Sequence, residues 1–354
     1  MTEKRIVCIT DVCSSIFAGG DAPKKQFSFE QTEDCCYPVF SNGESNNGLY
    51  GYTNTARVTE PSITVSARGT IGFTAIRLTP FTPIVRLISI TPIQDIIDID
   101  YLYYALSNYT PENTGTSIPQ LTVPMIKKYK FRLPEKDEQI RAVKVLKQID
   151  NILEIEKKQI QKLDELIKSR FVEMFGDPIS NTKGLVTKVL KDVLILKAGD
   201  FTAASDISDE PTDKKIYPCY GGNGIRGYVS DYNQEGEYSL VGRQGALSGN
   251  VQFTKGKFKN TEHALLVTPL VEMNNLWLNQ LLINLDLKRY QTGAAQPGLS
   301  VKNLQEIPIV AVPIEEQDYF ADFVTQVEKQ KATVQQSIDK LETLKKSLMQ
   351  GYFG

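Results

Sequence analysis

The sequence contains very little histidine, and this excludes several kinds of metal and catalytic site. His263 is the only histidine among 354 residues, and the five cysteines include the adjacent pair Cys35 and Cys36. These residues do not have the spacing of a zinc site, and adjacent cysteines are poor partners for a disulfide framework. The sequence therefore predicts a cytoplasmic protein with reduced cysteines and no metal ligands.

Long apolar runs and a strong net charge are also missing. No run approaches the roughly 20 apolar residues that a membrane helix needs, and the amino terminus has no signal-peptide core. Lys and Arg number 40 against 42 Asp and Glu. A strongly basic chain would indicate a nucleic-acid partner, so any such surface here must be local. We expect no membrane association.

The motifs of common enzymes are absent as well. Gly256-Lys257 is followed by Phe258 and lacks the earlier glycine of a phosphate-binding loop, and there is no N-P-P-[FY] run or Rossmann fingerprint. His263 adjoins an apolar, strand-like run, which favours a structural histidine over a catalytic one. A Ser–His–Asp arrangement in the second half and a diffuse carboxylate nuclease site leave no signature and stay open. We predict that the chain has no catalytic residues and is not an enzyme.

What the sequence does contain is a long helical pattern that occurs twice. Residues 137–175 hold no Gly or Pro, and their apolar residues step by alternating threes and fours, as in a coiled-coil seam. The pattern returns 178 residues later, where L-E-T-L-K-K-S-L-M at Leu341 matches L-D-E-L-I-K-S-R-F at Leu163. Two long helices in equivalent positions indicate a duplicated protein.

The charged residues of the two seams predict how the helices pair. Facing residues of an antiparallel pair have numbers that add to a constant, and a sum of 487 sets Glu156 opposite Lys331 with aliphatic residues paired elsewhere. A slide of one heptad sets each charge against an aliphatic residue, and a lone buried charge costs on the order of 3–5 kcal/mol. We therefore predict an antiparallel pair within the chain whose register is selected by Glu156 and Lys331. Pairing of each helix with another subunit is the alternative.

Each long helix follows a globular segment, and the two segments share motifs in the same order. Tyr37-Pro38 returns as Tyr217-Pro218, and T-G-T-S-I-P-Q-L-T-V returns as T-G-A-A-Q-P-G-L-S-V. The predicted fold is α+β, with two pseudo-repeated mixed α/β domains separated by a pair of long antiparallel coiled-coil helices. Strands are expected over residues 63–73 and 84–90 and a helix over 99–107. The predicted boundaries are 1–135, 136–176, 177–314 and 315–354.

Polar loops rich in Gly, Asn and Arg are the positive functional signal. Asn and Gln can read adenine edges in the major groove of DNA, and Arg can read guanine. For any single residue a role as a solvated surface residue or turn former is more common, so the clustering in duplicated loops carries the prediction. The predicted DNA-binding residues are Asn42, Asn46, Arg57 and Arg68 in the first half, Asn223, Arg226, Arg243, Gln244, Gln291 and Gln296 in the second, and Lys127 and Lys128 as phosphate contacts.

These motifs resemble the specificity subunits of type I restriction–modification systems over nearly the whole chain. The second half carries Y-P-C-Y-G-G-N-G-I-R-G-Y, V-G-R-Q-G-A, T-E-H-A-L, Q-T-G-A-A-Q-P-G-L-S-V-K-N-L and V-P-I-E-E-Q. The first half carries A-R-G-T-I-G, I-P-Q-L-T and K-D-E-Q. Each motif alone is weak, but their order, repeated twice, is specific.

The resemblance implies a non-catalytic subunit with two target recognition domains, each reading one half of a bipartite site in double-stranded DNA. It implies that the helices form a spacer and dock two methyltransferase subunits, and that a restriction subunit joins for cleavage. Cofactors are then expected on the partners only: S-adenosylmethionine, ATP and Mg²⁺. Compared with the family, the sequence lacks an extended amino-terminal segment and ends directly after the second helix, which predicts a shortened docking surface.

Two other functions remain open on the sequence alone. A coiled-coil scaffold protein would have the same helices without selecting a DNA sequence. A fused restriction enzyme is disfavoured because the methyltransferase motifs are missing.

Overall fold

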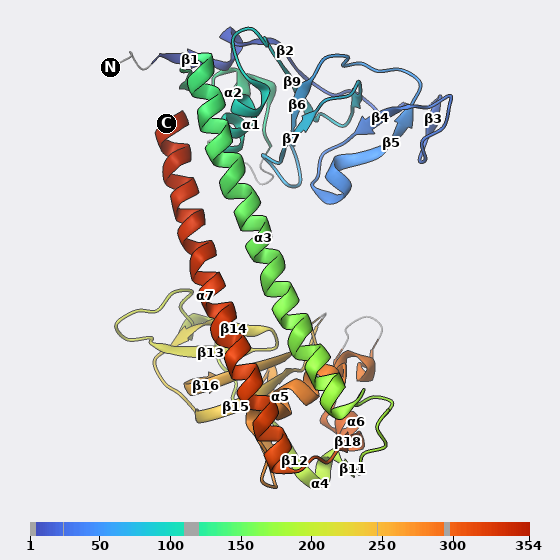
Figure 1. Cartoon of the computed structure of the whole chain (residues 1–354), viewed down its shortest axis with the longest axis vertical. Coiled ribbons are helices and arrows are strands. Elements are labelled where there is room, and N and C mark those ends of the chain that lie inside the picture. Colours follow the sequence, from blue (N-terminus) through green and yellow to red (C-terminus); the bar gives the residue numbers. More distant parts are fainter. Residues whose placement is uncertain (1–4, 24, 110–119, 246, 294–297) are drawn as a thin grey trace. The chain divides into compact units, whose positions relative to one another are not determined.

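The computed structural model describes residues 5–23, 25–109, 120–245, 247–293 and 298–354. The chain forms two compact units, unit 1 (Met1–Lys157 with Gln336–Gly354) and unit 2 (Lys158–Gln335). The boundary falls within helix α3 (Lys136–Phe175) and within helix α7 (Ile314–Phe353), so each unit contains one end of each long helix (Figure 1). None of the helices in the described residues is long and apolar enough to cross a membrane.

Both long helices run for 40 residues between clear sequence signals. Acidic residues occupy the first turn of each, Asp137 and Glu138 in α3, where they stabilise the positive end of the helix dipole. Helix α3 stops before Gly176, whose φ of +79° belongs to the left-handed region. A Cβ at this position would lie 2.7 Å from Thr182 Oγ1. Glycine therefore permits the chain to leave the helix here.

The described residues of unit 1 form three small sheets and two short helices besides the ends of the long helices. The first sheet has the order β2-β9-β6-β7, the second has the order β3-β5-β4-β8, and β1 pairs with β10. Helix α1 packs on β6 and β7, and helix α2 packs on β2. The bounds are β1 Ile6–Cys8, β2 Cys13–Ala18, β3 Phe27–Ser28, β4 Tyr37–Phe40, β5 Leu49–Thr53, β6 Ser62–Val65, β7 Thr74–Arg77, β8 Thr82–Pro83, β9 Ile88–Pro92, β10 Lys130–Arg132, α1 Ile99–Ser107 and α2 Val123–Lys127, with 3-10 turns η1 Ile9–Asp11 and η2 Ser45–Gly48.

Unit 2 repeats this plan with one larger sheet. Its order is β12-β17-β15-β16-β13-β14, and β11 pairs with β18. Helix α5 packs on β15 and β16 as α1 packs on β6 and β7. The bounds are β11 Thr187–Val189, β12 Leu194–Ala198, β13 Tyr217–Gly221, β14 Gly224–Val229, β15 Gln234–Gly242, β16 Val251–Asn260, β17 Ala264–Pro269, β18 Pro308–Val310, α4 Leu190–Val193, α5 Asn275–Asn284 and α6 Val301–Gln305, with 3-10 turns η3 Ala204–Asp206 and η4 Leu287–Tyr290.

The predicted helix is observed, but both predicted strands have other bounds in the structure. The strand predicted over residues 84–90 begins only at Ile88, because Val85 and Arg86 have φ of +51° and +64°. The helix predicted over residues 99–107 has those bounds in α1. The strand predicted over residues 63–73 ends at Val65, and a loop follows in which Gly69 and Gly72 have φ of +68° and +84°. An extended strand does not contain such residues, because positive φ turns the chain. The loop leaves Arg68 exposed.

A buried glutamine near the start of each long helix ties that helix to its unit. Gln139 Oε1 accepts from Asp98 N at 2.9 Å, and its Nε2 donates to Pro134 O at 2.9 Å. Gln317 Oε1 accepts from Asn274 N at 2.9 Å in the same way. Asp98 and Asn274 are the N-caps of α1 and α5. The same side chain therefore joins the long helix to the capped helix in both units.

Aromatic side chains bury the carboxyl end of each long helix. The Phe175 ring lies 6.0 Å from the Trp277 ring in unit 2, and the Phe353 ring lies 4.8 Å from the Tyr101 ring in unit 1. All four side chains are at most 2% exposed. Tyr101 and Trp277 each lie three residues after the N-cap of their helix. The duplication therefore extends to individual core contacts.

Within each unit α3 and α7 pack antiparallel as predicted, but the predicted register is wrong. In unit 1 Glu156 Oε1 accepts a hydrogen bond from Ser337 Oγ at 2.7 Å. In unit 2 Lys331 Nζ lies 2.6 Å from Asp164 Oδ1 and 2.9 Å from Glu328 Oε1. Lys331 thus meets a residue about one heptad beyond Glu156.

The register prediction failed because a charge in a seam layer can find its partner outside that layer. Lys345 Nζ reaches Asp150 Oδ1 at 2.5 Å, since the long lysine stem carries the ammonium group from an apolar layer to the helix flank. Burial lowers the pKa of Lys331, but the hydrogen bonds to Asp164 and Glu328 outweigh it, so the pKa lies above its usual value. We infer that the buried helix ends select the register instead.

Candidate nucleic-acid interface

Three loops of unit 1, residues 41–48, 66–73 and 84–87, are joined by one asparagine. Asn42 Nδ2 donates to Val85 O at 2.6 Å, and Asn42 Oδ1 accepts from Ala67 N at 2.8 Å. Asn42, predicted to bind DNA, therefore uses both ends of its amide within the protein. Its contribution to a DNA surface is to hold these loops together.

A buried arginine supports the first of these loops. Arg77 is 5% exposed, and its Nη2 donates to Asn47 O at 2.8 Å while its guanidinium carbon lies 3.7 Å from the centre of the Phe40 ring. Burial lowers the pKa of Arg77 to about 10, so the group stays charged at neutral pH. Asn46, at a φ of +48°, is held exposed at the loop tip. Sequence reasoning missed Arg77, although a charged residue in the apolar strand pattern A-I-R was a signal.

The other unit 1 candidates lie in three places. Arg68 is exposed in the second loop, and its Nη2 donates to Gln120 Oε1 at 3.2 Å. Arg57 is exposed, with its guanidinium carbon 4.7 Å from the centre of the Phe17 ring. Lys127 and Lys128 are exposed at the end of α2, which packs on η1 and β2. Arg68 and Asn46 are therefore on the joined loops, whereas the two lysines belong to another part of the unit.

Unit 2 has an equivalent set of converging loops, residues 221–224, 242–245 with 247–250, and 261–263. Arg243 N donates to His263 O at 3.0 Å, and Asn250 Nδ2 donates to Asn223 Oδ1 at 2.9 Å. The backbones approach so closely that a Cβ at Gly242 would overlap the carbonyl of Gly222. Glycine at position 242, in the motif V-G-R-Q-G, is thus needed to bring these loops together.

The residues of unit 2 that the sequence predicted to bind DNA differ in their exposure and in their contacts. Asn223, Arg226 and Gln244 are exposed, and Arg243 is half-buried. Gln291 Nε2 donates to Ser248 O at 2.5 Å, so this side chain fastens the second loop to the segment after η4. Gln296 lies outside the described residues.

Equivalent backbone contacts show which residues of the two loop sets correspond. Leu121 N donates to Ala67 O at 3.0 Å, and Leu299 N donates to Arg243 O at 2.8 Å. Ala67 therefore corresponds to Arg243, and Arg68 corresponds to Gln244.

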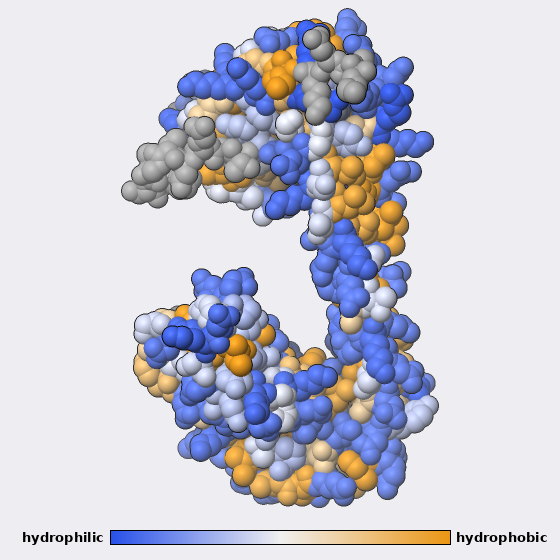
Figure 2. Space-filling model, turned by 90° about the vertical axis from the view of Figure 1, so that its left-hand side faces the viewer, coloured by the Kyte–Doolittle hydropathy of each residue, from blue (hydrophilic) through white to orange (hydrophobic). Residues whose placement is uncertain are grey.

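In each unit one flank of the helix pair exposes apolar side chains. We call Val145, Ile152 and Leu344, which are 37–48% exposed, the unit 1 flank. Figure 2 shows apolar surface gathered on the helical side of the upper body, which is unit 1. All three residues occupy the same heptad position beside the seam, so they share one side of the pair.

The equivalent surface of unit 2 contains a groove. The repeat of 178 residues relates Val145 in α3 to Phe323 in α7, and Leu344 in α7 to Leu166 in α3. With Tyr319 and Arg170, among others, they line a groove of about 720 Å³, and we call these residues the unit 2 flank. The duplication thus places an apolar flank in each unit.

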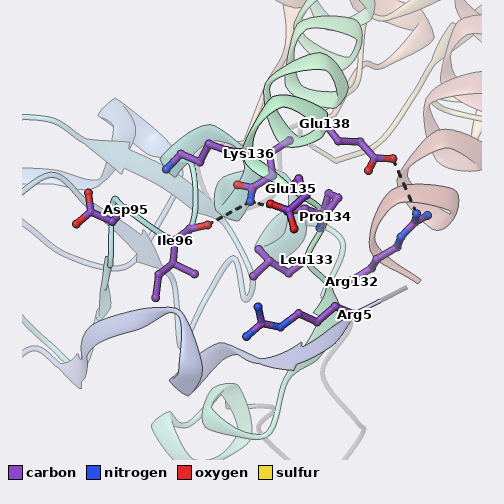
Figure 3. Close-up of a pocket in the computed structure, with 10 residues that line it drawn as sticks. Arg5, Asp95, Ile96, Arg132, Leu133, Pro134, Glu135, Lys136 and Glu138 are labelled. Carbon is purple, nitrogen blue, oxygen red and sulfur yellow. Dashed lines mark hydrogen bonds and ion pairs between the residues drawn. The ribbon is translucent and has the colours of Figure 1, made fainter. Parts of the chain in front are cut away.

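A polar pocket of about 640 Å³ lies at the start of α3 in unit 1 (Figure 3). Its lining includes Arg132, whose Nη2 lies 3.9 Å from Glu138 Oε1, and the carbonyls of Pro134 and Ile96 that accept from Gln139. These contacts fasten the helix, so the pocket is explained by its structural role. Among the described residues no cluster of three or more His, Cys, Asp or Glu could hold a metal ion.

Comparisons with known proteins agree with this arrangement. The family model for the type I restriction modification DNA specificity domain matches residues 1–165 and 183–343. The specificity subunit of the type I restriction enzyme EcoprrI from Escherichia coli is 31% identical over 314 residues, covering 81% of this chain and 75% of that protein. The MjaIX specificity subunit from Methanocaldococcus jannaschii is 27% identical over 159 residues, 39% of this chain and 37% of that protein.

The fold resembles solved structures of the same kind. A type I restriction–modification S subunit from M. genitalium has a TM-score of 0.61 at 17% identity, covering 100% of this chain and 97% of that chain. A chain from a type I system described for its complex assembly and conformational transition has a TM-score of 0.58 at 13% identity, covering 99% of this chain and 97% of that chain. The chain therefore belongs to the type I restriction–modification DNA specificity family and is a non-catalytic specificity subunit with two recognition domains.

Proposed function

We propose that the converging loops of each unit read one half of a bipartite target in double-stranded DNA. The observation that carries this proposal is the position shared by Arg68 and Gln244: both are exposed, polar and held by equivalent backbone contacts on a duplicated frame. An arginine and a glutamine at one structural position can each donate hydrogen bonds to base edges in the major groove. Asn46, Asn223, Arg226 and Arg243 act beside them, while Arg57, Lys127 and Lys128 contact phosphates.

The paired helices act as the spacer between the two readers. A helix of 40 residues is about 60 Å long at 1.5 Å per residue. That length suits two readers in successive major-groove faces, about 34–36 Å apart. Segments 1–135 and 177–314 then serve as the two recognition domains, and segments 136–176 and 315–354 serve as the spacer helices.

Two methyltransferase subunits dock on the apolar flanks, one on each unit. Support comes from the repetition of the flank, with Val145 and Leu344 in unit 1 and Phe323 and Leu166 in unit 2. The restriction subunit, S-adenosylmethionine, ATP and Mg²⁺ belong to the partners, and the complex acts in the cytoplasm.

Methylome sequencing tests the reading of DNA. A host that expresses the chain with its methyltransferase should show one split, asymmetric motif. A continuous motif, or no methylation, would refute the proposal.

Substitution of the flanks tests docking. Leu344→Asp and Leu166→Asp should each remove one methyltransferase subunit from the purified complex, because a carboxylate disfavours an apolar contact. Lys346→Ala, at an exposed position of the same helix as Leu344, is the matched control. Loss of both partners from either single variant, or of none, would contradict two separate docking sites. Native mass spectrometry gives the stoichiometry.

A further inference from the structure

The only histidine of the chain lies between two side chains of the unit 2 loops. His263 Nδ1 is 3.3 Å from Gln244 Oε1, and His263 Nε2 is 3.1 Å from Glu262 Oε1. Its own carbonyl accepts from Arg243 N. The ring is therefore attached to the loop that carries Gln244, and both of its nitrogens face oxygen atoms.

Glu262 is held in turn by the protein. Its backbone N donates to Asp200 O at 3.2 Å, and its Oε2 is buried without a hydrogen-bond partner. The carboxylate lies against Nε2 of the ring, and a proton on Nδ1 lets the ring donate to Gln244 Oε1. The side chain of His263 remains 39% exposed, so the ring lies at the surface of the loops.

With Nδ1 of the ring as the donor, the contact sets which end of the Gln244 amide faces outward. A free glutamine offers a carbonyl acceptor and an NH₂ donor together, which suits the N6 and N7 atoms of adenine. When the carbonyl is held by the ring, the NH₂ group is the end left to present. A donor matches the guanine edge, which has two acceptors, N7 and O6.

We propose that His263 is a positioning residue that orients the Gln244 amide, so that unit 2 selects guanine where an unrestrained glutamine would select adenine. This inference rests on the proposed function and deepens it, because it names the base class read at one position. Unit 1 needs no such positioning residue, because Arg68, at the equivalent position, carries only hydrogen-bond donors.

Two substitutions of His263, with side chains of nearly the same size, distinguish the roles of the two ring nitrogens. In His263→Asn the amide nitrogen stands near the place of Nδ1 and still donates to Gln244. In His263→Gln the amide nitrogen stands near the place of Nε2 and reaches Glu262 instead. H263N should keep the guanine preference, and H263Q should lose it.

The experiment uses the full chain with its methyltransferase partner and a set of duplexes that vary each base pair of the target in turn. H263Q should lower the guanine-over-adenine preference roughly 5- to 150-fold at one base pair, the range for one bidentate contact. The slope of log affinity against log salt should not change, because no phosphate contact is lost. H263N should match the parent chain at every position.

Variants of Gln244 keep the test decisive even if H263Q does not fold. This exposed residue can be changed without touching a core. Gln244→Ala should lose the guanine preference at the same base pair, and Gln244→Glu, which presents acceptors only, should prefer cytosine there.

Three outcomes would overturn the inference. Equal loss in H263N and H263Q would show that the Nδ1 donor is not the cause. An unchanged preference in Q244A, with a parent chain that selects its sequence, would refute the inference alone. A parent complex that selects no sequence would refute the proposed function and the inference together.

Discussion

The two units share their helix junctions and differ in their sheets and loops. Gln139 and Gln317 make the same buried hydrogen bonds, and Tyr101 and Trp277 pack on the same end of a long helix. The duplicated protein has therefore kept the contacts that fasten each unit to the helix pair. Its loops have been free to change, as expected for two readers of different half-sites.

One proline accounts for a large part of the difference between the sheets. In unit 2 the ten residues of β16 form one strand that pairs with β15 and, in parallel, with β13. In unit 1 the corresponding stretch is split into β7 and β8, and Pro80 lies between them. Proline has no N–H to donate and interrupts a strand, so two four-stranded sheets replace one of six.

The largest effect should come from the aromatic helix ends. Phe175→Ala should destabilise unit 2, and Phe353→Ala should destabilise unit 1, each by about 3–5 kcal/mol, because both side chains are fully buried. Urea denaturation followed by proteolytic mapping would show which unit unfolds first. If either substitution loosened both units equally, their cores would not be independent.

The buried glutamines should give a smaller but matched effect. Gln139→Ala and Gln317→Ala each leave backbone groups without partners, at a cost of about 1–3 kcal/mol. Gln148→Ala, at an exposed position of the same helix as Gln139, should be nearly neutral. The midpoint of urea denaturation measures all three, and a large difference between Q139A and Q317A would break the equivalence of the junctions.

Removing the charge of Lys331 from the seam of unit 2 should change the free energy of unfolding little. Lys331→Met should be neutral or stabilising, because it replaces a half-buried ion pair by an apolar layer. Asp164→Ala should cost about 1 kcal/mol, since it leaves the ammonium group with one partner fewer.

The pH dependence of this pair follows from the direction of the shift. The pKa of Lys331 is raised on folding, so its contribution to stability is complete below the unfolded value of about 10.4 and is lost as pH rises through the folded value. The difference between the parent chain and K331M should stay constant from pH 6 to 9. A difference that changed near neutral pH would contradict the assignment.

The smallest effect should come from a surface pair in unit 1. Lys157 Nζ lies 3.0 Å from Glu342 Oε1, with both side chains more than half exposed. Lys157→Ala should change the free energy of unfolding by less than about 1 kcal/mol, because water and salt screen such pairs. A loss several times larger would show that this contact, and not the buried helix ends, selects the register.

Much of the fold followed from sequence patterns, because duplication and periodicity are local signals. The bounds of α1, the two long helices and their antiparallel pairing were predictable, and so were the exposed positions of Arg68 and Gln244. The register of α3 and α7 was not predictable, because it depends on which lysine of one helix reaches which carboxylate of the other. Asn42 and Gln291 were read as DNA contacts because a sequence does not show that a side chain is already bonded within the protein.

Measuring the distance between the two half-sites in DNA tests most directly whether the helix pair sets the spacing of the two recognition domains. One heptad inserted after Lys157 in α3 and one after Gln335 in α7, where the units meet, lengthens both helices by about 10 Å. The methylome of this variant should show the same two half-sites with a spacer about three base pairs longer. An unchanged spacer, or altered bases in either half-site, would contradict this arrangement.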